Sequence, residues 1–266
     1  MNRSSFLRLV LPTLVWSPAH TAGGSGPLTV RLLAYNIHHG EGEDGKLDLP
    51  RIAGVIKNCG ADIVLLQEVD DRTTRTGKVP QADELGRLTG LHPAFGKAMD
   101  FAGGGYGNAA LSRFPVKTSR VIPLPGGKED RCALEVALEV GPKALPLTVV
   151  STHLDVSVAD ARKTHAALLA REFAARPEHV IIGGDFNSTR SDPPLAQFTA
   201  PWRVAPKTHG DPNTIPSGTP DREIDFFILK PTGHGPPPQV VRHEVLDEKV
   251  ASDHRPILME VAFPAP

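Results

Sequence analysis

The chain is poor in cysteine, in aromatic residues and in net charge. Only Cys59 and Cys132 occur among its 266 residues, too few for a disulfide framework or for a zinc site built from thiolates. We therefore expect both to be buried, unpaired thiols. With 2 tryptophans, 2 tyrosines and 10 phenylalanines, the sequence also offers little material for exposed aromatic platforms that stack on nucleic-acid bases or insert into membranes.

The near-neutral charge limits the classes of partner. A net charge of −1 and a pI near 6.8 argue against broad electrostatic binding of nucleic acid, which needs basic patches that neutralise several phosphates. A nuclease is still compatible with these values. One local cluster of positive charge follows Glu68 in DDRTTRTGK, where Arg72 and Arg75 are candidates for binding an anionic substrate. A solvated loop explains the same charges equally well.

Long apolar runs are also missing. No segment beyond the N-terminus approaches the roughly 20 apolar residues of a membrane span. Residues 1–26 instead show the outline of a secretory signal peptide, with Arg3 and Arg8 ahead of an apolar stretch that small residues follow. Arg8 and Pro12 interrupt this stretch, so a disordered leader is the alternative. We expect a secreted or periplasmic protein if the leader is cleaved, and a cytoplasmic one otherwise.

Residues 27–266 predict one α/β domain, which we expect to be monomeric. A chain of this length with 40% hydrophobic residues can bury a sizeable core. Apolar and alternating runs predict strands at 28–36, 61–68, 108–114, 132–140, 145–153, 178–185, 224–229, 239–245 and 256–263. Helical patterns cover 48–59, 81–90 and 158–175. Many strands and few helices fit two packed mixed sheets with helices outside them.

Polar side chains stand where these apolar runs break. The segment GGDFN follows the apolar residues 180–182 and places Asp185 and Asn187 at the end of a buried strand, where α/β proteins build sites. Alone, such a segment is ordinary turn chemistry. Other runs, however, break at Asn36, Glu68, His153 and Asp225, and Asp253 and His254 precede the last run. Packing alone does not explain this convergence.

In this order, the segments resemble those of the endonuclease/exonuclease/phosphatase superfamily. The resemblance rests on LLAYNIHHG, DIVLLQEVD, GGGYGNAALSRFP, LTVVSTHLD, GGDFN, REIDFFIL and SDHRPILMEV, and it spans roughly residues 28–263. It implies a four-layer α/β sandwich with a site at one end between the two sheets. Members of the superfamily include pancreatic-type deoxyribonucleases, abasic-site endonucleases, inositol polyphosphate 5-phosphatases and neutral sphingomyelinases.

Glu68 is the best candidate for a metal ligand. A carboxylate at the end of an apolar strand is costly unless it is paired, and a hard divalent cation is its natural partner. The resemblance implies that Asn36 supplies an oxygen to the same cation or a donor to the phosphate, and that Asp253 binds the cation directly or through water. We expect Mg²⁺, with Mn²⁺ as the alternative.

Asp185 and His254 are the candidates for the chemical step. Asp185 is expected to deprotonate or orient the attacking water, and Asn187 to hold that water or the phosphate. His254, as imidazolium, can donate to a phosphoryl oxygen in the transition state. The resemblance implies that Asp225 fixes the tautomer of His254 and raises its pKa.

Four further residues are weaker candidates. By resemblance, His153 binds the phosphate or assists the leaving group, and Tyr106 and Asn108 contact the scissile phosphate. Glycine-rich turns before strands also carry Tyr and Asn for structure only. His38 is a candidate for the pocket wall, but consecutive histidines in a loop are usually solvated, so we do not expect His38 and His39 to bind metal.

These observations predict a Mg²⁺-dependent phosphoester hydrolase, specifically a phosphodiesterase. IHHGEGEDGKLDLPRIA and LQEVDDRTTRTG are similar to a bacterial branch of the superfamily that resembles proteins acting on inositol-containing lipids, which favours a small or lipid-derived phosphodiester. A secreted deoxyribonuclease is the main alternative. A non-enzymatic binding protein is the second, since fold does not imply function. A binding protein derived from an enzyme would be expected to have lost at least one of Glu68, Asp185, Asp253 and His254. All four are present in this sequence.

Overall fold

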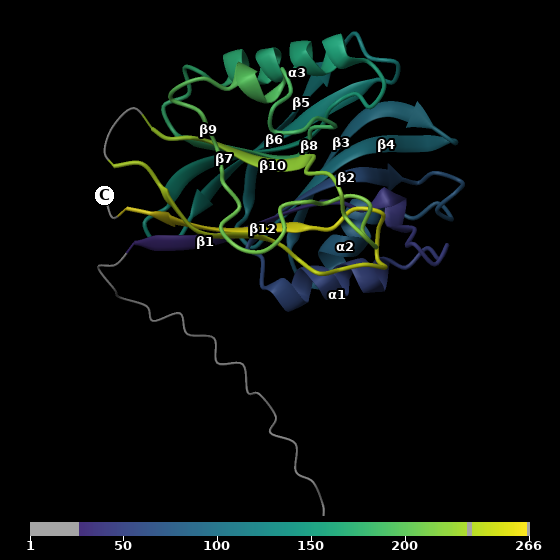
Figure 1. Ribbon diagram of the computed structural model, residues 1–266. Coiled ribbons are helices and arrows are strands. Elements are labelled where there is room, and N and C mark those ends of the chain that lie inside the picture. Colours follow the sequence, from purple (N-terminus) through teal and green to yellow (C-terminus); the bar gives the residue numbers. More distant parts are fainter. Residues whose placement is uncertain (1–26, 233–235, 265–266) are drawn as a thin grey trace, which may run out of the picture.

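The computed structural model describes residues 27–232 and 236–264, which form two six-stranded sheets packed face to face (Figure 1). The first sheet has the order β11-β12-β1-β2-β4-β3 and contains β1 (Leu28–Asn36), β2 (Ile63–Asp71), β3 (His92–Phe101), β4 (Gly104–Ser112), β11 (Gln239–Val245) and β12 (Ile257–Phe263). The second has the order β5-β6-β7-β8-β10-β9 and contains β5 (Val116–Leu124), β6 (Arg131–Val140), β7 (Leu145–His153), β8 (His179–Asp185), β9 (Arg203–Val204) and β10 (Asp225–Lys230). The expected leader, residues 1–26, lies outside the described residues.

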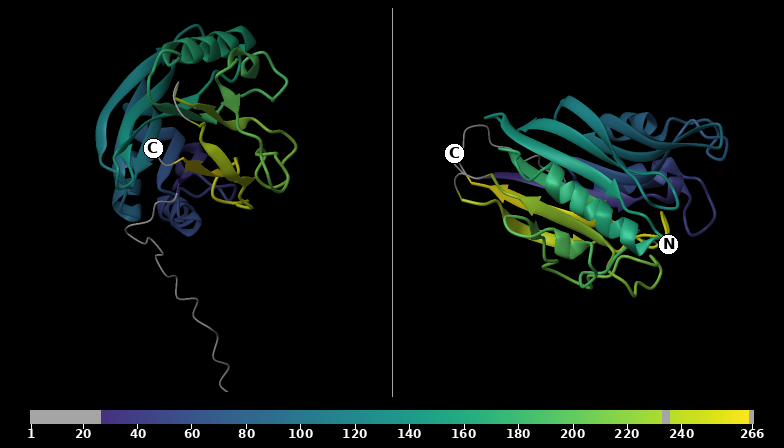
Figure 2. Two further views of the ribbon diagram at one scale, coloured as in Figure 1. Left: turned by 90° about the vertical axis from the view of Figure 1, so that its left-hand side faces the viewer. Right: turned by 90° about the horizontal axis from the view of Figure 1, so that it is seen from above.

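Three helices cover the outer faces of the sheets. Helices α1 (Leu49–Cys59) and α2 (Gln81–Thr89) pack on the first sheet, and α3 (Ala159–Glu172) packs on the second (Figures 1 and 2). Asp48 caps α1 by accepting a hydrogen bond from the backbone N–H of Arg51 at 2.9 Å. Gly60 ends the helix at φ 63°, a left-handed conformation that glycine adopts without strain. The predicted four-layer α/β sandwich is confirmed.

The core between the sheets is apolar and closely packed. Leu32, Leu65, Val149 and Ile181 come from the four central strands and are at most 1% exposed. Gly183 lies in this core, where an added Cβ would lie 2.6 Å from the Phe227 ring on the paired strand and 2.9 Å from Leu65 of the facing sheet. Only glycine fits there, which explains the first residue of GGDFN.

The two sheets repeat one arrangement. In the first, β1 and β2 are parallel and α1 connects them; in the second, β7 and β8 are parallel and α3 connects them. An antiparallel strand lies on each side of both pairs: β12 and β4 in the first sheet, β6 and β10 in the second. Asn36, His153 and Asp185 are therefore the last residues of equivalent parallel strands.

The cysteines and the helices bear on two further expectations. Cys59 and Cys132 form no disulfide, as expected, but Cys59 is only partly buried. Among the helices in the described ranges, none has the length and apolar character required to span a membrane.

Candidate active site

A cavity of about 360 Å³ lies where the two sheets meet at the ends of these strands. The predicted site residues that line it are Glu68, Arg75, Tyr106, His153, Asp185, Asn187, Asp253 and His254. Residues more than 180 positions apart in the sequence therefore share one cavity wall.

Asp185 stands at the centre of the polar groups. It is 1% exposed, and its Oδ1 accepts a hydrogen bond from the backbone N–H of Asn187 at 2.8 Å. Its Oδ2 accepts one from Asn36 Nδ2 at 3.2 Å. The same oxygen lies 3.3 Å from His153 Nε2 and 3.6 Å from His254 Nε2. Burial raises the pKa of Asp185 to about 7, even though the charge on His254 opposes the shift.

His254 is held as a cation. Its Nδ1 lies 2.9 Å from Oδ2 of Asp225, and that carboxylate also accepts a hydrogen bond from Thr214 Oγ1 at 2.6 Å. Burial alone would lower the pKa of His254, but the charges of Asp225 and Asp185 outweigh it and raise the pKa to about 10. Both ring nitrogens of His254 are then donors.

His153 is held neutral by a residue that the sequence reasoning missed, Arg131. Arg131 is the first residue of β6 and 6% exposed, and its Nη1 lies 3.2 Å from His153 Nδ1. A guanidinium only donates, so Nδ1 of His153 accepts from Arg131. Nε2 faces both Asp185 Oδ2 at 3.3 Å and the amide nitrogen of Asn187 at 2.9 Å. Burial, followed by the charge of Arg131, lowers the pKa of His153 well below its usual value. The two histidines beside Asp185 thus differ in charge.

Arg131 also reaches Tyr106 and the cavity. Its Nη1 donates to the hydroxyl of Tyr106 at 3.4 Å, and its Nη2 pairs with Glu129 at 2.9 Å. Its Nε has no hydrogen-bond partner among the described residues. An arginine directly before an apolar strand was the only sequence signal for this role, and many surface arginines share it.

Glu68 owes its position to a bulge in β2. The pairing of β2 with β4 shifts register between Leu66 and Val69, and Glu68 adopts a left-handed φ of 56°. Bulges re-aim side chains in this way next to active sites. Glu68 Oε1 then accepts a hydrogen bond from Asn36 Nδ2 at 3.0 Å. Because the same amide also donates to Asp185, Asn36 joins the two carboxylates.

Two predicted substrate-binding residues lie elsewhere. Asn108 is 2% exposed and donates to the carbonyl of Cys132 at 2.7 Å, so it connects β4 to the facing sheet and is not among the cavity-lining residues. The side chain of Arg72 is 58% exposed and pairs with Asp71 at 2.7 Å, beside a separate shallow hollow. By contrast, Arg75 lines the cavity, although its charge is paired with Asp70 at 2.7 Å.

The paired histidines also depart from expectation. His39 is 8% exposed, so the expectation of a solvated loop is wrong for this residue. His38 is half-buried and not among the cavity-lining residues. Both belong to the short 3-10 helix η1 (His38–Gly40), which follows β1 directly.

Comparison with known proteins identifies the family. A model of the Endonuclease/Exonuclease/phosphatase family matches residues 33–254. The uncharacterized protein YbhP of Escherichia coli K12 is 26% identical over 246 residues, which cover 87% of this chain and 95% of YbhP. An endonuclease/exonuclease/phosphatase from Beutenbergia cavernae has a TM-score of 0.72 at 25% identity, over 90% of this chain and 72% of its own. A mannosyl-6-phosphatase from Bacteroides thetaiotaomicron shares the fold, with a TM-score of 0.74 at 16% identity over 88% of this chain and 100% of its own. The chain therefore belongs to the endonuclease/exonuclease/phosphatase family, hydrolases that act on phosphoesters.

Proposed function

We propose that this chain is a divalent-metal-dependent phosphodiesterase that cleaves its substrate by direct attack of water. One observation carries the proposal: the carboxylate of Asp185 stands between a neutral histidine at 3.3 Å and a cationic one at 3.6 Å, in the wall of a single cavity. A base beside two donors of different charge is what in-line hydrolysis of a phosphoester requires.

The proposed roles follow from the contacts. Asp185 accepts a proton from the attacking water, and Asn187, held by its backbone bond to Asp185, orients that water. His254 donates from Nε2 to a phosphoryl oxygen as charge develops in the transition state. His153, whose Nε2 faces Asp185 and Asn187, binds the phosphate or assists the leaving oxygen. Tyr106 and Arg131 provide further donors on the same wall.

The donor set fits a hard divalent cation. Carboxylates of Glu68, Glu129, Asp185 and Asp253 line one cavity, and such oxygen ligands suit Mg²⁺ or Mn²⁺. Glu68 and Asp253 would hold the ion. Asn36, the third predicted ligand, turns its Nδ2 to Glu68 and its Oδ1 to the backbone N–H of His38, so in this orientation it supports the carboxylate of Glu68. When bound, the ion polarises the phosphoryl group and neutralises its charge.

The rest of the cavity favours a small or lipid-derived phosphodiester. The cavity lining also includes the apolar residues Met99, Phe101, Val156 and Ile215, which we call its apolar wall. Phe101 and Val156 are 37% and 55% exposed, so the apolar wall reaches solvent. A substrate with a phosphate at one end and an apolar group at the other matches both walls.

A hydrolysis panel tests the proposal. Wild type and Asp185→Asn would be compared with Mg²⁺ or EDTA on bis(p-nitrophenyl) phosphate, p-nitrophenyl phosphate, vesicles containing an inositol phospholipid, vesicles containing sphingomyelin, and plasmid DNA. We expect Mg²⁺-dependent cleavage of the small diester and of a lipid, lost in the variant. Preferential nicking of plasmid would replace the proposal with a nuclease, and cleavage of the monoester alone would replace it with a phosphatase. Silence on every substrate would favour a binding role.

A further inference from the structure

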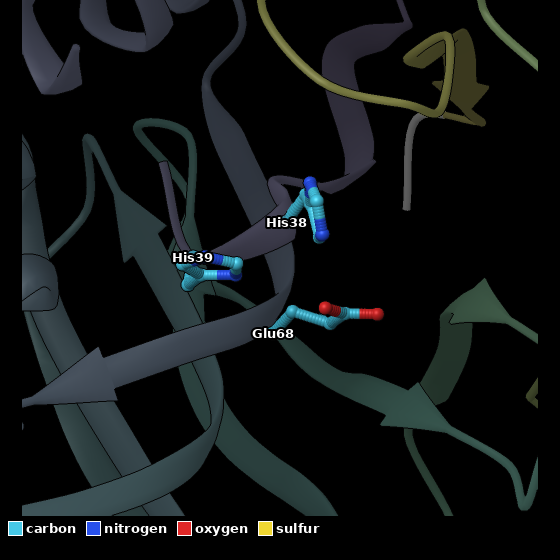
Figure 3. Close-up of side chains that lie close together, drawn as sticks. All are labelled: His38, His39 and Glu68. Atoms are coloured by element: carbon cyan, nitrogen blue, oxygen red, sulfur yellow. The ribbon is translucent and has the colours of Figure 1, made fainter. Parts of the chain in front are cut away.

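A second group of metal-ligating side chains stands beside the cavity. His38 and His39 leave η1 directly after β1, and Glu68 reaches them from the bulge of β2 (Figure 3). One ligand atom of each residue lies within 4.8 Å of the others. The two imidazole rings are 4.6 Å apart and inclined by 72°. Figure 3 shows the His38 ring over the Glu68 carboxylate, with the His39 ring to one side.

The backbone of this group is strained and fixed. His38, His39 and Glu68 adopt φ values of 44°, 46° and 56°, a left-handed region that costs free energy for residues other than glycine. The turn is held because Gln81 Nε2 donates to the carbonyl of His39 at 2.6 Å. Strain of this kind persists where the surrounding structure fixes a functional geometry.

His39 carries an unused lone pair inside the protein. Its Nε2 lies 3.4 Å from a carboxylate oxygen of Glu41, and the negative charge of that carboxylate favours the ring proton on Nε2. Nδ1 then has a free lone pair, and it has no hydrogen-bond partner among the described residues although the atom is buried. A carboxylate behind one histidine nitrogen and an open lone pair on the other is the arrangement of a metal-binding imidazole.

We propose that His38, His39 and Glu68 bind a late first-row divalent cation such as Zn²⁺, at a site separate from the oxygen-lined Mg²⁺ position. Two imidazoles and a carboxylate suit Zn²⁺, whereas Mg²⁺ prefers oxygen ligands. In a tetrahedral site, two ligand atoms about 2.1 Å from one ion stand about 3.4 Å apart. Ligand atoms at the observed 4.8 Å limit would therefore have to approach one another by about 1.4 Å when the ion binds. This site goes beyond the proposed function. It shares only Glu68 with the proposed Mg²⁺ site, and the Glu68 carboxylate has one oxygen for each ion.

Zn²⁺ titration by calorimetry tests the site. The full chain would be titrated without substrate, in saturating Mg²⁺, as wild type, His38→Asn and His39→Asn. Asparagine tolerates the left-handed backbone of both positions, so these variants remove the imidazole with little added strain. His92→Asn, at the exposed start of β3, is the matched control. Circular dichroism and thermal unfolding check that each variant folds, and the visible spectrum of bound Co²⁺ reports nitrogen ligands.

The expected result is one Zn²⁺ per chain in wild type and in His92→Asn. Either of the other variants should bind at least about tenfold more weakly, since loss of a mere supporting partner already costs that much. Unchanged binding in both, or no binding to wild type, would overturn the proposal. His254→Asn would be titrated in the same way, and loss of binding only in that variant would also overturn the proposal, because the ion would then lie with Asp185 and Asp225. Because no turnover is measured, these results do not depend on the proposed phosphodiesterase activity.

Discussion

Nδ1 of His254 lies 2.9 Å from Oδ2 of Asp225, and Thr214 donates to the same oxygen at 2.6 Å. Asp225 is 2% exposed and is not among the residues lining the cavity, so any effect it has on a substrate passes through the imidazole. Since Nε2 of His254 points to Asp185 at 3.6 Å, the pair sets both the charge and the direction of the donor beside the proposed base.

Asp225→Asn should therefore lower kcat with little change in KM. Loss of the carboxylate removes the charge that keeps His254 protonated, and a positioned acid or base contributes about 10²–10⁴-fold to a rate. Steady-state kinetics on bis(p-nitrophenyl) phosphate would measure the loss. Thr214→Val, which removes the hydrogen bond to Asp225 and a longer one from the backbone N–H of Ile224 but keeps the charge, should cost far less. Equal effects of the two changes would count against this role.

Glu68→Gln should weaken the dependence on metal. The amide keeps the size of the side chain but loses the charge that attracts a hard cation, so we expect the Mg²⁺ concentration for half-maximal rate to rise by about tenfold or more, as for loss of a metal-supporting group. A titration of rate against Mg²⁺ measures this. Glu129→Gln is the matched control, because Glu129 lines the same cavity but pairs with Arg131. An unchanged half-maximal concentration in Glu68→Gln would remove Glu68 from the metal site.

Arg131→Met should lower kcat/KM by about 10–100-fold, the equivalent of losing a charged hydrogen bond of roughly 1.5–3 kcal/mol. The substitution removes both a donor to the phosphate and the charge that contacts Nδ1 of His153 and helps to keep the ring neutral. Arg72→Met removes the same charge from an exposed side chain outside the cavity and should change little. Comparable losses in the two variants would point to a diffuse electrostatic effect.

Most of the fold could be predicted because central strands are buried on both faces. Residues 28–36 and 145–153 were predicted with the bounds of the central strands β1 and β7, and residues 239–245 with those of the edge strand β11. The strands that were missed, β3, β5 and β9, all lie at a sheet edge in the described topology. Edge strands need less apolar surface and tolerate proline, as Pro93 in β3 and Pro123 in β5 illustrate.

The site could be predicted only in part, because motifs mark residues and not contacts. The approach of Asp185 to His153 and to Asp225, the partner of His254, follows from the pairing of β7, β8 and β10, which places strand ends together. The bulge at Glu68 and the inward turn of Arg131 depend on tertiary packing and leave no periodic signal. The burial of His39 likewise depends on Gln81, 42 positions away in the chain.

His243 should make the protein lose stability in mild acid. This β11 residue is 0% exposed, and its Nδ1 lies 3.2 Å from the carbonyl of Pro206. Burial, with help from the charge of Lys207, lowers its pKa to about 3. The folded protein therefore holds the ring neutral, and the unfolded chain takes up a proton below about pH 6.5.

The neutral ring of His243 thus makes its full contribution to the free energy of unfolding above pH 6.5. This contribution is lost as the pH falls toward 3, at up to about 1.4 kcal/mol per pH unit. His243→Asn should unfold at a lower urea concentration at pH 7, because it leaves a cavity, but its stability should fall less steeply between pH 7 and pH 5. His165 and His179, whose pKa values burial also lowers, remain in both proteins. Urea midpoints at each pH give the slope of stability against pH for both proteins, and the difference between the two slopes therefore isolates the effect of His243. Parallel slopes would show that its ring is not held neutral.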